Sequence, residues 1–218
     1  MFQYILFDLD GTLTDSKLGI TRCVAYALER YGIIEEDLSK LEIFIGPPLR
    51  DSFMEFYGFD AVKAEEAVAV YRERFSTIGL YENEVYEGVV GMLHRLKAAG
   101  KDLAIASSKP TVFVQKILEH FEIKDCFSVV IGSFLDGTRD KKEEVVEAAL
   151  EELLGEIKGT KENTAMIGDR KFDIQGAKEH GITAVGVGYG FANEGELEEA
   201  GADYIVETVT ELEALLLQ

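Results

Sequence analysis

The sequence contains few cysteines, prolines and histidines: two, three and three among 218 residues. Two cysteines, Cys23 and Cys126, cannot build a disulfide framework, and their separation matches no metal-binding spacing. Proline is rare and apolar residues make up 47% of the chain, a composition that excludes a disordered protein. We therefore expect a folded protein of a reducing compartment, the cytoplasm.

Positive charge and long hydrophobic runs are also scarce. The chain has 22 lysines and arginines against 41 aspartates and glutamates, a net charge of −19. A chain this acidic repels the phosphate backbone of a nucleic acid. We therefore expect no nucleic acid partner. No apolar stretch approaches the roughly 20 residues that span a bilayer. The first apolar run ends at Asp8 and Asp10 and does not fit a secretory signal, so we expect no membrane association.

Short apolar runs rich in β-branched residues recur along the chain, separated by stretches with helical periodicity. Such continuous runs are typical of strands buried on both faces of a parallel sheet. The predicted strands are Tyr4–Phe7, Leu103–Ala106, Ser128–Ile131, Thr164–Ile167, Ala184–Val187 and Tyr204–Val206. The predicted helices include Val89–Ala99, Pro110–His120, Lys142–Leu154 and Ile174–Glu179. The alternation predicts an α/β fold, a Rossmann-like parallel sheet core with helices on both faces.

Residues 15–82 interrupt this alternation, because they show helical patterning and no clear strand. Apolar residues at helical spacing, including Ile20, Val24 and Leu28, predict an amphipathic helix. Glycines such as Gly32 and Gly58 divide the segment into about four helices. We therefore predict a core domain of residues 1–14 and 83–218, with an all-helical cap domain of residues 15–82 inserted after the first strand.

Acidic and hydroxyl side chains stand at the ends of the predicted strands. Asp8 and Asp10 come after the first strand, Ser107 after the second, and Asp169 and Asp173 after the fourth. Ligands of open parallel sheets bind beyond the carboxyl ends of the strands, so we expect these residues at one edge. Carboxylates gathered there would repel one another unless a cation is shared between them. An oxygen-only donor set favours Mg²⁺.

The same edge carries groups that suit a phosphate. Ser107 can donate a hydrogen bond, and Gly11 and Thr12 can turn their backbone N–H groups toward an anion. A lysine, either Lys141 or Lys142, can supply positive charge, and the helical spacing favours Lys142. Together with a Mg²⁺ site, these groups predict phosphoryl transfer, which depends on positioning and charge neutralisation.

Four segments, in order along the chain, resemble the four motifs of the haloacid dehalogenase superfamily. They are Asp8-x-Asp10-Gly11-Thr12-Leu13-Thr14, Ser107, Lys142 and Gly168-Asp169-x3-Asp173. The resemblance covers essentially the whole chain, and the helical insertion lies where the superfamily's first type of cap lies. The loop Gly46-Pro47-Pro48-Leu49-Arg50 and the run 168–174 are most similar to phosphoglycolate-phosphatase-like members.

This resemblance implies a role for each catalytic residue. Asp8 would be the nucleophile that forms an aspartyl phosphate. Asp10 would protonate the leaving oxygen and then activate the hydrolytic water. Ser107 would hold the phosphoryl group, and Lys142 would neutralise it together with Asp8.

The resemblance also implies a metal site and a substrate site. Mg²⁺ would bind Asp8, the backbone carbonyl of Asp10 and Asp169, with Asp173 as a further ligand or as a neighbour that orients the others. The residues expected to contact the substrate are Gly11, Thr12, Ser108, Lys109 and, through a second anionic group, Arg50. The segment 186–190 does not fit a dinucleotide fingerprint, and we expect a flexible loop there.

The expected activity follows from Asp10, because the superfamily's dehalogenases and phosphonatases lack an aspartate at that position. We predict a Mg²⁺-dependent phosphatase, phosphoglycolate-phosphatase-like, acting on a small-molecule phosphate monoester. The alternatives are a β-phosphoglucomutase-like sugar phosphomutase and a 5'-nucleotidase-type nucleotide phosphatase. The mutases usually carry a cap histidine, and no histidine precedes His94 here. We expect a monomer or homodimer.

Overall fold

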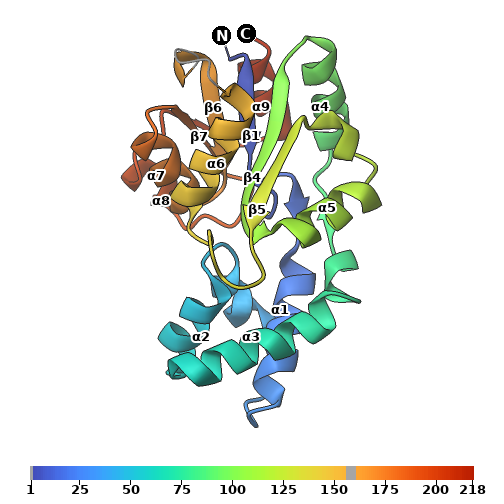
Figure 1. Ribbon diagram of the computed structural model, residues 1–218, viewed down its shortest axis with the longest axis vertical. Coiled ribbons are helices and arrows are strands. Elements are labelled where there is room, and N and C mark those ends of the chain that lie inside the picture. The colour runs from blue at the N-terminus through green and yellow to red at the C-terminus, as the bar shows by residue number, and fades with distance from the viewer. Residues whose placement is uncertain (1, 156–160) are drawn as a thin grey trace. The chain divides into compact units, whose positions relative to one another are not determined.

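The computed structural model of the chain divides into two compact units (Figure 1). The core unit consists of Met1–Thr14 and Val85–Gln218, and the second unit is Asp15–Glu84. The structure describes residues 2–155 and 161–218. The predicted core range also takes in residues 1 and 156–160, which lie outside the described residues. Across the described chain, no helix is both long and apolar enough to cross a membrane.

The core unit is built on a six-stranded sheet in which every strand is parallel to its neighbours. Its order is β5-β4-β1-β6-β7-β8. The strands are β1 (Tyr4–Phe7), β4 (Asp102–Pro110), β5 (Val129–Ser133), β6 (Thr164–Gly168), β7 (Thr183–Val187) and β8 (Tyr204–Val206). All six overlap the runs predicted from apolar content, and the α/β fold prediction is confirmed.

Helices cover both faces of this sheet (Figure 1). Leu6, Ala106 and Met166 belong to a buried cluster with α6 (Lys142–Leu154) and α7 (Lys171–Glu179), which also contact each other. Strand residues alternate between faces, so Ile5, Phe7 and Ile105 point to the opposite face, and all three are fully buried. The remaining core helices are α4 (Val89–Ala98), α5 (Thr111–His120), α8 (Glu196–Glu199) and α9 (Val209–Leu216), with short 3₁₀ turns η3 (Lys124–Cys126) and η4 (Lys161–Asn163).

The second unit is mainly helical. Its elements are α1 (Lys17–Glu29), η1 (Leu38–Phe44), α2 (Leu49–Tyr57), α3 (Ala61–Phe75) and η2 (Gly79–Tyr81). Helices α1 and α3 pack on each other, and Phe53 lies between the rings of Phe44 and Phe59 at centroid distances of 4.9 and 5.8 Å. Gly19 permits close packing of α1, since a Cβ there would lie 2.1 Å from the carbonyl oxygen of Gly79.

Two short strands carry the chain from one unit to the other. β2 (Thr14–Asp15) and β3 (Glu84–Val85) form a two-stranded sheet of their own. The sequence did not predict them, because a strand of two residues is too short to show periodicity.

Candidate active site

The three central strands deliver the candidate catalytic groups to one edge of the sheet. β1 lies between β4 and β6, so the residues that follow it are flanked by those at the ends of its two neighbours. The Asp8 N–H donates to the carbonyl oxygen of Ile167 at 2.9 Å, which extends the β1–β6 pairing by one residue. Asp169 follows β6 directly, so the chain positions Asp8 and Asp169 side by side.

Three buried carboxylates meet at this edge, and we call Asp8, Asp169 and Asp173 the acidic trio. One carboxylate oxygen from each lies within 4.8 Å of those from the other two. Asp173 belongs to the first turn of α7, where its Oδ2 accepts a hydrogen bond from the Arg170 N–H at 3.0 Å. Gly168 leaves room for it, because a Cβ on Gly168 would lie 2.1 Å from the Asp173 Cγ.

Lys142 is the cation of the acidic trio. Its Nζ lies 2.8 Å from Asp8 Oδ1 and 2.7 Å from Asp173 Oδ1, and it donates to the carbonyl oxygen of Ala106 at 3.1 Å. The ammonium therefore forms two ion pairs and one hydrogen bond at this site. Lys142 is buried while Lys141 is exposed, so the structure selects Lys142 from the two adjacent lysines.

The charges of this site do not balance. Burial raises the pKa of Asp169 well above its usual range, and the carboxylates of Asp173 and Asp8 raise it further. Burial also raises the pKa of Asp173, although Lys142 acts in the opposite direction. Burial disfavours the charged form of Lys142, yet Asp173 and Asp8 outweigh it and raise its pKa. One ammonium thus faces three carboxylates, and a divalent cation bound through oxygen donors fits both the remaining charge and the donor set.

A loop after β7 holds Asp169 in place. The Phe191 N–H donates to Asp169 Oδ2 at 2.8 Å, and the Thr12 hydroxyl donates to Oδ1 at 3.5 Å. Gly190 comes so close that a Cβ there would lie 2.3 Å from the Cβ of Asp169. The Tyr189 hydroxyl donates to the carbonyl oxygen of Thr12 at 3.0 Å. Sequence reasoning expected a flexible loop here, and the repeated glycines after a strand were the one signal of close backbone packing.

Asp10 lies outside the acidic trio and is paired with Lys109. The Lys109 Nζ lies 2.7 Å from Asp10 Oδ1 and 2.6 Å from Oδ2. The buried Ser107 accepts a hydrogen bond from the Lys109 N–H at 3.4 Å. Lys109 and Ser108 were both expected to contact substrate. In this structure the Lys109 ammonium contacts Asp10, and the Ser108 carbonyl oxygen accepts from the Ser133 hydroxyl at 2.8 Å, while the contact of both residues with substrate stays a prediction.

The amides of Gly11 and Thr12, which were expected to bind an anion, form hydrogen bonds within the chain. The Gly11 N–H donates to the carbonyl oxygen of Thr14 at 2.8 Å, and the Thr12 N–H donates to that of Leu9 at 3.3 Å. Both amides therefore close the turn after β1, and their contact with a substrate stays a prediction. Gly11 is required there for another reason, since its φ is +82° and a Cβ would lie 2.1 Å from Asp169 Oδ2.

Arg50 belongs to the second unit, at the start of α2. Its Nε lies 3.1 Å from Glu65 Oε1, and the two side chains are 48% and 62% exposed. An exposed ion pair of this kind contributes little to stability. The expectation that Arg50 binds a second anionic group of the substrate stays a prediction.

Comparison with known proteins gives a family and several close relatives. The model of the haloacid dehalogenase-like hydrolases matches residues 5–187. A 5'-nucleotidase of Pseudomonas aeruginosa is 51% identical over 196 residues, which cover 90% of this chain and 87% of the relative. A phosphoglycolate phosphatase of Colwellia psychrerythraea is 30% identical, over 96% and 95% of the two chains. The crystal structure of a predicted phosphatase from Clostridium acetobutylicum is similar with a TM-score of 0.94 and 47% identity, covering 100% and 99%.

Proposed function

The chain belongs to the haloacid dehalogenase-like hydrolase family, and from this membership and the acidic trio we propose that it is a Mg²⁺-dependent phosphatase of small phosphate monoesters. The proposal rests on the buried cluster of Asp8, Asp169 and Asp173. Lys142 forms ion pairs with Asp8 and Asp173 in this cluster. Burying three carboxylates beside one ammonium costs desolvation free energy. A bound divalent cation would offset this cost.

Mg²⁺ is proposed to bind Asp8, Asp169 and the backbone carbonyl of Asp10. Asp173 would be a further ligand or a neighbour that orients the others. When bound, the ion would supply positive charge to the phosphoryl oxygens during transfer. Lys142 adds a fixed positive charge beside Asp8, and Ser107 offers a hydroxyl to a phosphoryl oxygen.

The proposed reaction has two steps. An oxygen of the Asp8 carboxylate attacks phosphorus, the bond from phosphorus to the ester oxygen breaks, and protonated Asp10 gives its proton to that leaving oxygen. Water then attacks phosphorus of the aspartyl phosphate and Asp10 takes the water's proton. The bond from phosphorus to Asp8 breaks, which releases inorganic phosphate and restores both carboxyl groups.

For the substrate, the relatives support nucleoside 5'-monophosphates ahead of phosphoglycolate. The 5'-nucleotidase relative is 51% identical, and the phosphoglycolate phosphatase relative is 30% identical. A sugar phosphomutase is less well supported, since no histidine precedes His94. We propose that the second unit selects among these esters.

The test is phosphate release from a panel of esters: nucleoside 5'-monophosphates, 2-phosphoglycolate, ribose 5-phosphate and β-glucose 1-phosphate. We expect release with Mg²⁺, none with excess chelator, and a loss of at least about 10³-fold in kcat for Asp8→Asn, which keeps the side-chain size. Isomerisation of the glucose phosphate without phosphate release would identify a mutase. Hydrolysis that is indifferent to chelation would contradict the metal assignment.

A further inference from the structure

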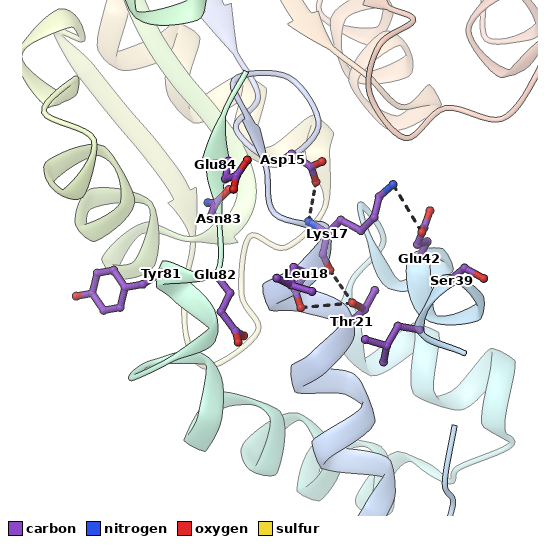
Figure 2. Close-up of a pocket in the computed structure, with 11 residues that line it drawn as sticks. Asp15, Lys17, Leu18, Thr21, Ser39, Glu42, Tyr81, Glu82, Asn83 and Glu84 are labelled. Atoms are coloured by element: carbon purple, nitrogen blue, oxygen red, sulfur yellow. Dashed lines mark hydrogen bonds and ion pairs between the residues drawn. The ribbon is translucent and has the colours of Figure 1, made fainter. Parts of the chain in front are cut away.

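The second unit contains a pocket of about 400 Å³ that lies wholly within residues 15–84 (Figure 2). Its size falls in the range of small-molecule sites. The start of α1, the turn η1 and the segment 81–84 supply its walls. The lining residues are Asp15, Lys17, Leu18, Thr21, Leu38, Ser39, Glu42, Tyr81, Glu82, Asn83 and Glu84.

Asn83 is the residue that marks this pocket as a binding site. It is about nine-tenths buried, and neither its Oδ1 nor its Nδ2 has a hydrogen-bond partner. Buried polar side chains nearly always form hydrogen bonds. A side-chain amide whose oxygen and nitrogen both lack one therefore indicates a missing partner. That partner must offer an acceptor to Nδ2 and a donor to Oδ1.

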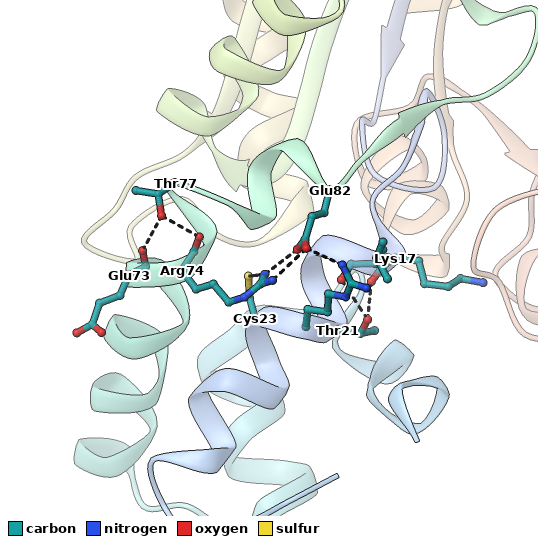
Figure 3. A network of polar contacts seen from close by, with 9 residues as sticks. Lys17, Thr21, Cys23, Glu73, Arg74, Thr77 and Glu82 are labelled. Atoms are coloured by element: carbon teal, nitrogen blue, oxygen red, sulfur yellow. Dashed lines mark hydrogen bonds and ion pairs between the residues drawn. The ribbon is translucent and has the colours of Figure 1, made fainter. Parts of the chain in front are cut away.

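Two of the four carboxylates that line the pocket are already neutralised. Glu82 is held by Arg74 Nη1 at 2.6 Å, Arg74 Nη2 at 3.0 Å and Arg22 Nη1 at 2.7 Å (Figure 3). The hydrogen bond from Arg74 lowers the pKa of Glu82. Glu42 lies 3.6 Å from the Lys17 Nζ. This network also fixes the segment that carries Asn83.

The other two carboxylates keep their charge available to a ligand. Within residues 2–155 and 161–218, neither Asp15 nor Glu84 forms an ion pair, and Asp15 accepts only the Lys17 N–H, at 3.0 Å. The pocket therefore repels anions and attracts groups that donate hydrogen bonds.

We propose that this pocket binds the amino-bearing edge of a nucleobase. An asparagine amide pairs in a bidentate manner with adjacent donor and acceptor atoms of a base, and carboxylates accept from exocyclic amino groups. A metal ion or a simple ammonium offers no acceptor for Asn83 Nδ2, so neither meets the requirement. Leu18 and Leu38 supply apolar surface against which the flat ring can lie. The proposal goes beyond the phosphatase assignment and depends on residues of the second unit alone.

The experiment is titration calorimetry of the full chain with adenosine and with inosine, which differ in the exocyclic amino group. We expect adenosine to bind at least about tenfold more tightly than inosine, and Asn83→Leu to weaken adenosine binding by at least about tenfold. Asn163→Leu is the matched control, because Asn163 is exposed and lies in the core unit. Its affinity for adenosine should equal that of the wild type.

Two results would overturn the proposal: equal affinity of the wild type for adenosine and inosine, or an Asn83→Leu protein that keeps its melting temperature and binds adenosine as before. Should Asn83→Leu fail to fold, Asp15→Leu replaces it. This variant lacks the acceptor for the exocyclic amino group, so the ratio of its affinities for adenosine and inosine should fall toward one. An unchanged preference in that variant contradicts the proposal.

The base could belong to a nucleotide substrate or to a free nucleoside that regulates the enzyme. Hydrolysis of ribose 5-phosphate in the presence of adenosine separates the two sources. A higher KM at constant kcat assigns the base to the substrate, and a changed kcat assigns it to a regulator. Calorimetry needs no turnover, so a chain that bound adenosine yet hydrolysed no ester would refute the proposed function and leave this inference standing.

Discussion

Lys142 carries the electrostatic balance of the acidic trio. Its ammonium forms ion pairs with both Asp8 and Asp173 and donates to the carbonyl oxygen of Ala106. A buried carboxylate that loses its only charge partner is strongly destabilising, because the desolvated charge remains. The stability of the core unit and the proposed chemistry of the site therefore depend on the same side chain.

We predict that Lys142→Met lowers the free energy of unfolding by about 3 kcal/mol without added metal. Lys141→Met is the control and should change it by less than about 0.5 kcal/mol, because Lys141 is exposed. Urea denaturation at neutral pH measures both variants. Equal stability of the two variants would show that the ammonium of Lys142 does not compensate the negative charge of the acidic trio.

Lys109 positions Asp10 with two short contacts, and this pairing leads to a test of the proposed acid. We predict that Lys109→Met reduces kcat for an alkyl phosphate by at least about tenfold, because a misplaced Asp10 protonates the leaving oxygen poorly. The loss should be smaller for p-nitrophenyl phosphate, whose leaving group needs little protonation. Similar losses for both esters would indicate that Lys109 acts elsewhere.

The sequence predicted correctly those residues that lie at the ends of the strands. Asp8 and Asp169 adjoin because β1 and β6 are parallel neighbours, and Lys142 is buried because it lies on the apolar side of α6. The contacts of Lys109 with Asp10 and of Phe191 with Asp169 were missed. Both depend on loop backbone conformations that tertiary packing decides and no local pattern encodes.

The first turn of helix α7 is held in place by a residue outside the helix. Glu196 accepts hydrogen bonds from Arg170 Nε at 2.8 Å, the Lys171 N–H at 2.9 Å and the Asn193 N–H at 3.1 Å. Burial opposes ionisation, but these donors lower the pKa of Glu196 to about 2. Glu196 thus connects the start of α8 to the first turn of α7, which carries Asp173.

We predict that Glu196→Gln costs about 1–2 kcal/mol of unfolding free energy at neutral pH. The folded pKa is lower than the unfolded one, so this contribution is complete above about pH 4.5 and disappears as the pH falls toward about 2. Denaturation curves of wild type and Glu196→Gln should therefore converge in acid. The exposed Glu198→Gln is the control, and a difference that is constant with pH would contradict the linkage.

Long elements were predicted well from the sequence and short ones were not. Every core strand and the helix Lys142–Leu154 coincide with a run of apolar or helical periodicity. The strands β2 and β3 have two residues each and were missed. The predicted flexible loop at 186–190 is partly strand, since β7 continues to Val187, and its later residues pack against Asp169.

For the whole molecule, the net charge of −19 opposes an anionic substrate at long range. Lys142 and Lys109, at the carboxyl edge of the sheet, form ion pairs with Asp8, Asp173 and Asp10. The proposed Mg²⁺ would therefore add to Lys142 the positive charge that an incoming phosphate meets. The fold and the family could be predicted because four motifs occur in order, whereas the location in the cell and the oligomeric state stay predictions.

The proposed mechanism depends on Asp8 as the acceptor of the phosphoryl group. Acid quenching during turnover with Mg²⁺, followed by borohydride reduction and peptide mass spectrometry, converts an aspartyl phosphate to homoserine and so reports the residue that carried it. We expect homoserine at position 8 in the wild type and none in Asp8→Asn or with chelator. Phosphate release at the full rate without homoserine at position 8 would contradict the account.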